Sequence, residues 1–219
     1  MSGPGDGRIP WRYERREIVA DGVVHALGIG FAVIGGASLI AVAASTAGFG
    51  EFAAVTVYLV TLMAVLGLSA TYNLWPVGPV KWRLRRYDHA AIFLLIAGTY
   101  TPFLAQIKAG MAGLAMLAGI WTTALAGAAL KIALPGRFDR VAIGLYLLLG
   151  WSGIAVWDGM VDTLAPATIW LLAAGGALYT LGVVFHVWES LRFQNAIWHA
   201  FVLAAAICHY AAVAGVVVG

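Results

Sequence analysis

Seven long apolar runs, separated by short polar connectors, dominate the hydrophobic pattern of the chain. The runs extend over about 18–44, 52–75, 88–107, 110–132, 139–157, 164–187 and 194–217. Each run is long enough for a helix to cross a hydrocarbon core of about 30 Å. The connectors GFGE, PVGPVKWRLRR, LPGRFDR and DGMVDTLAP contain the turn formers and charges typical of loops between spans. The pattern therefore predicts an all-α fold, a bundle of seven transmembrane helices.

The composition places this bundle in a membrane. The 219 residues are 62% hydrophobic and 11% charged, and the mean hydropathy of +0.90 lies outside the range typical of soluble domains. We expect residues 1–17 to form a cytoplasmic N-terminal segment and residues 18–219 to form one membrane domain. The only cysteine, Cys208, lies inside the last apolar run, so an intrachain disulfide is excluded.

The basic residues predict the orientation of the bundle. Twelve of the thirteen Lys and Arg residues lie before the first run or near the connectors that follow the second, fourth and sixth runs, which are all on one side of the membrane. Lys108, after the third run, is the one basic residue on the other side. Because cytoplasmic loops carry the excess of positive charge, the N-terminus is expected in the cytoplasm and the C-terminus outside. The basic balance of the chain is explained in this way, and no nucleic-acid partner is expected.

Polar side chains concentrate at the cytoplasmic ends of five spans. They are Glu17, Asp21 and His25 in the first run, Ser69 and Asn73 in the second, Asp88 and His89 in the third, His186 and Glu189 after the sixth, and Asn195 and His199 in the seventh. Ionisable groups inside a membrane are costly and mark functional sites by default. We therefore predict a polar cavity that opens to the cytoplasm.

Structural roles remain open for the same residues. Asp88 can favour the dipole of its helix and pair with Arg85 or Arg86. Ser69, Asn73 and Asn195 can instead form hydrogen bonds between helices. Glu17, Asp21 and His25 can form the face by which the first helix enters the membrane. His89 and His209 can be structural, and His186 and Glu189 can be interfacial residues.

Several motifs resemble the hemolysin III branch of the progestin and adipoQ receptor (PAQR) superfamily. They are EIVADGVVHALGIG in the first run, SATYN in the second, RRYDHAAIFLLIAGTYTPF in the third and NAIWHAFVLAAAICHY in the seventh. The resemblance extends from about residue 15 over nearly the whole chain. It implies a multi-pass protein of the bacterial inner membrane with a role in membrane lipid homeostasis, and animal relatives that resemble ceramidases imply hydrolysis of lipid amides.

The resemblance also implies a zinc site, and this chain departs from it. The family holds zinc with one histidine that closes a Ser-x-x-x-His motif and two that form His-x-x-x-His, beside an aspartate. Ser69, Asp88 and His199 match these motifs, but Asn73 and Asn195 stand at two of the three ligand positions. A catalytic zinc needs three protein ligands, and an amide oxygen is a poor one. We therefore expect no metal, and a network of hydrogen bonds among these five side chains in its place.

Three functions are compatible with these residues. The leading hypothesis is a cavity that binds or senses a membrane lipid without hydrolysing it, and nothing in the sequence indicates an oligomeric state. The alternative is a zinc-dependent intramembrane lipid amide hydrolase with Asp88 and Ser69 as candidate catalytic residues. A metal would then be held by His199 with Asp88 or His25, with His186 as a further substitute, and the rearranged site of the hydrolase would comprise Asp21, His25, Asp88 and His199. The third is a proton or ion path through Glu17, Asp21, His25, Asp88 and His199.

Overall fold

The computed structural model describes residues 13–107 and 110–218. Its elements are α1 (Arg15–Thr46), α2 (Phe49–Leu74), α3 (Pro79–Gln106), α4 (Gly110–Ala133), α5 (Asp139–Trp151), the 3-10 helix η1 (Ser152–Val156), α6 (Trp157–Thr163), α7 (Pro166–Val187) and α8 (Gln194–Val218). Seven helical segments in this part of the chain are long and apolar enough to span a membrane, with α5, η1 and α6 counted as one segment, Asp139–Thr163. The predicted all-α, seven-span fold is confirmed; the orientation of the termini stays a prediction.

Two spans differ from their expected form. The third was expected from residue 88, but α3 begins nine residues earlier at Pro79, a favoured first helical residue. Its first turns carry the basic cluster and bury Lys81 and Arg85 against neighbouring helices, which hydropathy alone does not reveal. The fifth span was expected as one helix, but it is interrupted by η1. Tyr100 of α3 lies at this interruption: its hydroxyl donates to the carbonyl of Gly150 at 2.8 Å and accepts the N–H of Gly153 at 2.7 Å.

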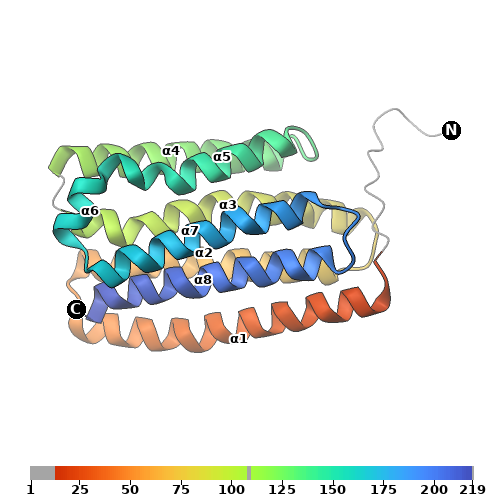
Figure 1. The fold of residues 1–219 in the computed structure, drawn as a ribbon, viewed down its shortest axis with the longest axis horizontal. Coiled ribbons are helices and arrows are strands. Elements are labelled where there is room, and N and C mark those ends of the chain that lie inside the picture. The colour runs from red at the N-terminus through yellow and green to blue at the C-terminus, as the bar shows by residue number, and fades with distance from the viewer. Residues whose placement is uncertain (1–12, 108–109, 219) are drawn as a thin grey trace.

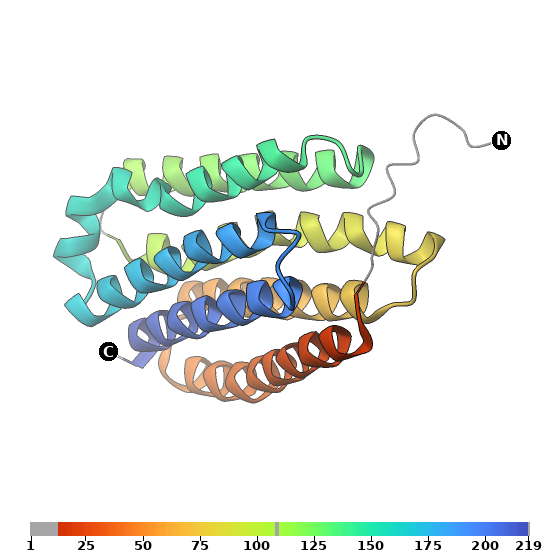
Figure 2. The same ribbon diagram turned by 45° about the vertical axis from the view of Figure 1, so that its right-hand side comes forward.

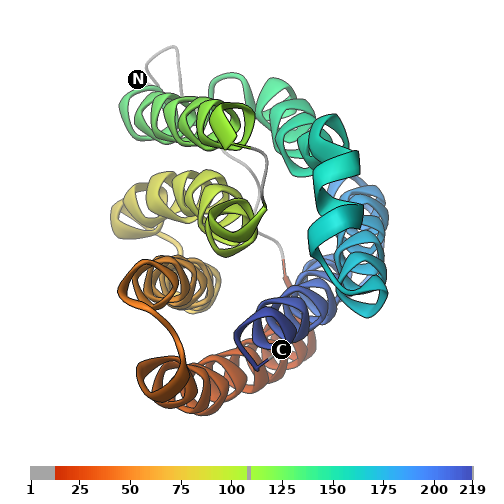
Figure 3. The same cartoon turned by 90° about the vertical axis from the view of Figure 1, so that its left-hand side faces the viewer.

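The helices lie side by side along the long axis of the molecule (Figure 1). Viewed along this axis, they form a ring in which α4, α3, α2 and α1 follow one another, and α8, α7 and α5 complete the circle (Figure 3). Figures 1 and 2 show α6 at the end of the bundle opposite the start of α1. The start of α1, the end of α2 and the starts of α3 and α8 therefore meet at one end, where the polar residues lie.

Small residues allow the helices of the ring to approach closely. Gly98 of α3 faces Thr61 of α2, and Gly127 of α4 faces the ring of Phe93 of α3. Gly175 of α7 faces His209, whose ring nitrogen Nε2 lies 3.3 Å from the carbonyl oxygen of Leu172. A β-carbon at any of these glycines would clash with the facing side chain, so these contacts need glycine.

Candidate functional site

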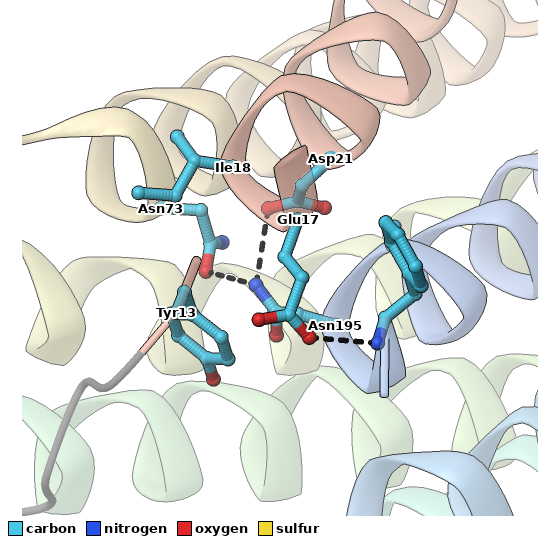
Figure 4. Close-up of a pocket in the computed structure, with 8 residues that line it drawn as sticks. Tyr13, Glu17, Ile18, Asp21, Asn73 and Asn195 are labelled. Atoms are coloured by element: carbon cyan, nitrogen blue, oxygen red, sulfur yellow. Dashed lines mark hydrogen bonds between the residues drawn. The ribbon is translucent and has the colours of Figure 1, made fainter. Parts of the chain in front are cut away.

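The polar end of the bundle is built from α1, α2, α3 and α8. Asp21 and His25 are one turn apart on α1, Ser69 and Asn73 are one turn apart on α2, and Asn195 and His199 are one turn apart on α8. Residues four apart on a helix share one face, so each pair presents two polar side chains to the interior. Figure 4 shows Asp21, Asn73 and Asn195 converging from three different helices.

His199 is held by Asp21. The ring atom Nδ1 of His199 lies 2.6 Å from Oδ1 of Asp21, and both side chains are buried. Because a carboxylate can only accept, Nδ1 carries a proton. The other ring atom, Nε2, lies 3.4 Å from the hydroxyl oxygen of Ser69 and 3.5 Å from Nδ2 of Asn73. The imidazole is therefore fixed between α1 and α2.

The two asparagines connect the same three helices. Nδ2 of Asn195 donates to Oδ2 of Asp21 at 3.0 Å and to Oδ1 of Asn73 at 2.9 Å (Figure 4). Nδ2 of Asn73 donates to the carbonyl oxygen of Ser69 at 2.9 Å and lies 3.3 Å from its hydroxyl oxygen. An amide side chain both donates and accepts, so it can link a carboxylate to a hydroxyl, which an acceptor alone cannot do.

The group formed by Glu17, Asp21 and His25, expected as a secondary cluster, divides in the structure. The ring of His25 lies 4.4 Å from the ring of His199, and its Nε2 lies 3.6 Å from Oδ2 of Asp21. Asp21 and His25 therefore belong to the main cluster. Glu17 instead accepts the backbone N–H of Phe193 at 2.8 Å and that of Glu14 at 2.8 Å, which caps α1 and fixes the start of α8 (Figure 4).

A second group of charges lies beside this cluster and contains residues that the sequence did not single out. Asp139 at the start of α5 accepts from Arg85 at 2.7 Å and forms an ion pair with the buried Lys131 of α4. Arg85, one of the two arginines that could pair with Asp88, thus pairs with Asp139. The imidazole of His89 lies 3.9 Å from each of the carboxylates of Asp88 and Asp139. The sequence feature that could have revealed this group is the proximity of Lys131, at the end of one span, to Asp139, at the start of the next.

Asp88 is buried and joins the two groups. Its carboxylate lies within electrostatic reach of Ser69, His199 and Arg85. Tyr13, which precedes α1, lies over the Asp21 side of the cluster. Partial burial, together with the charges of Asp21 and Glu17, raises the pKa of Tyr13, so its phenol stays protonated.

A cavity of about 820 Å³ extends from this polar end into the bundle. Its polar lining includes Ser69, Asp88, Asn195 and His199, and its walls are mainly apolar side chains of α3, α5, α7 and α8, among them Leu95, Ile96, Leu104, Leu147, Leu172 and Val202. Cavities of about 300–1,000 Å³ with apolar walls and a few polar groups are typical of small-molecule sites. Hydroxyl groups and His209 also line the cavity.

Comparison with known proteins identifies the family. The model of haemolysin-III related proteins matches residues 14–210. The chain belongs to the haemolysin III family. It is 36% identical over 191 residues to hemolysin-3 of Bacillus cereus, covering 86% of each chain. It is 33% identical over 188 residues to the hemolysin-3 homolog of Bacillus subtilis, covering 86% of this chain and 88% of the relative.

An animal protein is also related. The human monocyte to macrophage differentiation factor is 30% identical over 168 residues, which cover 72% of this chain and 67% of that protein. The resemblance to the hemolysin III branch of the PAQR superfamily is thereby confirmed. This haemolysin III family chain is an integral, multi-pass membrane protein, and its bacterial relatives indicate the inner membrane as its location.

The residues present do not fit the zinc site that the family implies. The positions expected to supply three imidazoles supply two amides and His199, and the amides are engaged with Asp21, Ser69 and one another. Within the described residues, the one group of three strong donors is Asp21, His25 and His199, whose ligand atoms lie within 4.8 Å of one another. Nδ1 of His199 and Oδ1 of Asp21 are 2.6 Å apart, whereas two ligands of one tetrahedral zinc ion are separated by roughly 3.4 Å.

Proposed function

We propose that this haemolysin III family protein binds a membrane lipid, with the acyl chain in the cavity and the polar group of the lipid at the cluster. The observation that supports the proposal is the continuity of one cavity from Ser69 and His199 to the apolar walls. An amphipathic ligand needs such a combination, because its chain gains from burial while its polar group needs hydrogen-bond partners. Detection of lipid composition in membrane homeostasis is the role we infer.

We further propose that the site works without zinc. The hydrogen bonds of Asn73 and Asn195 occupy the place of two metal ligands, and they satisfy the carboxylate of Asp21 and the hydroxyl of Ser69 directly. Polar groups with hydrogen-bond partners, as these four side chains have, are stable in a low-dielectric interior. No metal is then required to hold α1, α2 and α8 together.

A pair of adjacent alanines on α7 offers a test of lipid binding. Ala173 lines the cavity, and Ala174 is exposed on the outer side of the helix. Ala173→Trp fills the cavity and is expected to lower the lipid retained through detergent purification, measured by mass spectrometry, by about tenfold, which corresponds to about 1.4 kcal/mol. Ala174→Trp adds the same volume outside the cavity and is expected to retain the lipid. Equal retention in both variants, with both proteins folded, would contradict the proposal.

Zinc analysis decides between this function and the second candidate, a metal-dependent lipid amide hydrolase. The observation that favours the second candidate is the convergence of Asp21, His25 and His199. We expect less than one tenth of an equivalent of zinc in protein purified without chelator. One equivalent, removable only by strong chelation and lost in His25→Gln, would establish the metal site instead.

A further inference from the structure

Ser69, His199 and Asp21 are arranged as a nucleophile, a base and the group that orients the base. The hydroxyl oxygen of Ser69 lies 3.4 Å from Nε2 of His199, and Nδ1 of the same ring lies 2.6 Å from Asp21. A serine becomes a nucleophile when a neighbouring imidazole can take its proton and a third group holds that imidazole in place. Such contacts are often long before substrate binds and shorten in the complex.

The hydrogen bonds around Asp21 select the ring form that this chemistry needs. Since Nδ1 of His199 donates to Asp21, the lone pair of the neutral ring is on Nε2 and faces Ser69. The second carboxylate oxygen of Asp21 accepts from Asn195 at 3.0 Å, so the carboxylate cannot rotate freely. Asp21 is therefore a positioning residue, and His199 is the base.

Asn73 supplies a hydrogen-bond donor beside the hydroxyl oxygen of Ser69. Its Nδ2 lies 3.3 Å from the hydroxyl oxygen of Ser69 and donates to the carbonyl oxygen of the same residue, which leaves its second hydrogen directed toward the reacting group. In serine hydrolases an amide donor stabilises the oxyanion that forms on the carbonyl oxygen of the substrate by about 3–4 kcal/mol, and Asn73 is close enough to the Ser69 oxygen to serve a substrate bonded to it.

We propose that Ser69, His199 and Asp21 perform metal-independent acyl transfer on a lipid carboxylic ester that occupies the cavity. The proposal rests on the proposed lipid site, because Ser69, Asn73 and His199 all line that cavity. It also departs from the expectation, drawn from the sequence, that the protein hydrolyses nothing. The two proposals are nevertheless separable by experiment, since binding and covalent reaction have different readouts.

The chemical step is balanced by groups at the site and by water. The oxygen of Ser69 forms a bond to the acyl carbon while its proton passes to Nε2 of His199. The bond from the acyl carbon to the alcohol oxygen then breaks, and the alcohol takes the proton from Nε2. Water attacks the acyl-serine in the same way, with His199 again accepting and returning the proton, and a carboxylic acid leaves. Asp88 also lies near the hydroxyl of Ser69, so it is the competing base that an experiment must distinguish.

A fluorophosphonate probe tests the nucleophile without knowledge of the substrate. The full-length protein in lipid nanodiscs is treated with the probe, and mass spectrometry locates the adduct. We expect an adduct on Ser69 that forms equally in the presence of a strong chelator and disappears in Ser69→Ala. Ser38→Ala is the matched control, because the hydroxyl of Ser38 is bonded to the carbonyl oxygen of Ile34 on the outer helix α1, and its labelling is expected to equal that of the unmodified chain.

The rate of labelling assigns the base and the positioning residue. His199→Gln is expected to lower the maximal rate of adduct formation on the order of 100-fold, as expected for the loss of a general base. Asp21→Asn is expected to lower the maximal rate while the probe concentration for half-maximal rate stays unchanged, a split that a general structural defect would not produce. A larger loss in Asp88→Asn than in His199→Gln would overturn the assignment of the base.

Two results would overturn the proposal as a whole. One is the absence of an adduct on Ser69 in the unmodified protein, under conditions that fully label an authentic serine hydrolase. If Ala173→Trp nevertheless lowers the lipid retained and Ala174→Trp does not, the acyl-transfer proposal fails and the lipid site stands. The other is loss of the adduct on chelation, which would assign the reaction to a metal. Equal lipid retention in Ala173→Trp and Ala174→Trp, with the adduct on Ser69 still formed, would instead contradict the lipid proposal alone.

Discussion

Nδ2 of Asn195 donates to Oδ1 of Asn73 at 2.9 Å, which joins α8 to α2 at the two positions where the family resemblance places metal ligands. One amide thus donates a hydrogen bond to the other at the positions where two imidazoles would each direct a lone pair at a metal ion. The pair connects directly to Asp21 and Ser69. The geometry of the fold is therefore retained by side chains that form hydrogen bonds to each other.

Restoring both histidines should restore a metal site. We expect Asn73→His with Asn195→His to bind about one equivalent of zinc, because three imidazoles including His199 would then converge as in a catalytic zinc site. Elemental analysis after treatment with a weak chelator measures this. Each single variant serves as a control and should bind far less zinc than the double variant. A double variant without zinc would show that the surroundings of the site, and not the ligands alone, have diverged.

The ion pairs of Asp139 should stabilise the bundle. Asp139→Asn keeps the shape of the side chain but leaves the buried cations Arg85 and Lys131 without their carboxylate. The expected loss is about 2–3 kcal/mol, at or below the lower end of the range for a fully buried pair, because the carboxylate of Asp139 is one third exposed. Thermal unfolding in detergent measures it. Asp162→Asn, at an exposed position of α6, should leave the unfolding temperature unchanged within about 1 °C.

Close helix contact predicts a cost for a single methyl group. Gly175→Ala would bring a β-carbon onto the ring of His209 and within 3.2 Å of the carbonyl oxygen of Ala205. We expect a loss of about 1–3 kcal/mol, as for overpacking in a protein interior. Gly119→Ala on α4 is the matched control, since nothing lies within 4 Å of the added carbon, and alanine there should be neutral or slightly stabilising. Equal stability of the two variants would mean that α7 and α8 are not packed this closely.

The orientation of the bundle can be measured with single cysteines. In a Cys208→Ala background, Ser190→Cys lies between α7 and α8 and Ala165→Cys lies between α6 and α7, both at exposed positions. Because the excess of Lys and Arg lies at the Ser190 end, this end is expected in the cytoplasm. A membrane-impermeant thiol reagent applied to intact cells should modify Ala165→Cys and leave Ser190→Cys unmodified. The reverse pattern would invert the topology and place the polar cluster outside.

Local properties of the chain sufficed to predict the spans. A run of about twenty apolar residues is its own evidence for a transmembrane helix, since the requirement to cross the hydrocarbon core does not depend on neighbours. The early start of α3 and the interruption at η1 were not predictable in this way. Arg85 can be buried only because Asp139 lies opposite, and the turn at Gly153 is bonded by Tyr100.

The polar end shows the same division. The sequence determined that Ser69, Asn73, Asn195 and His199 occur one turn apart in pairs, at ends of helices that the charge pattern places in one leaflet. Only the tertiary structure decided that Asp21, 178 positions before His199, is its partner at 2.6 Å. Spacing along one helix is fixed by the helical repeat, whereas contact between α1 and α8 depends on how the whole ring closes. The hydrogen bond between Asp21 and His199 therefore depends on the packing of α1 against α8.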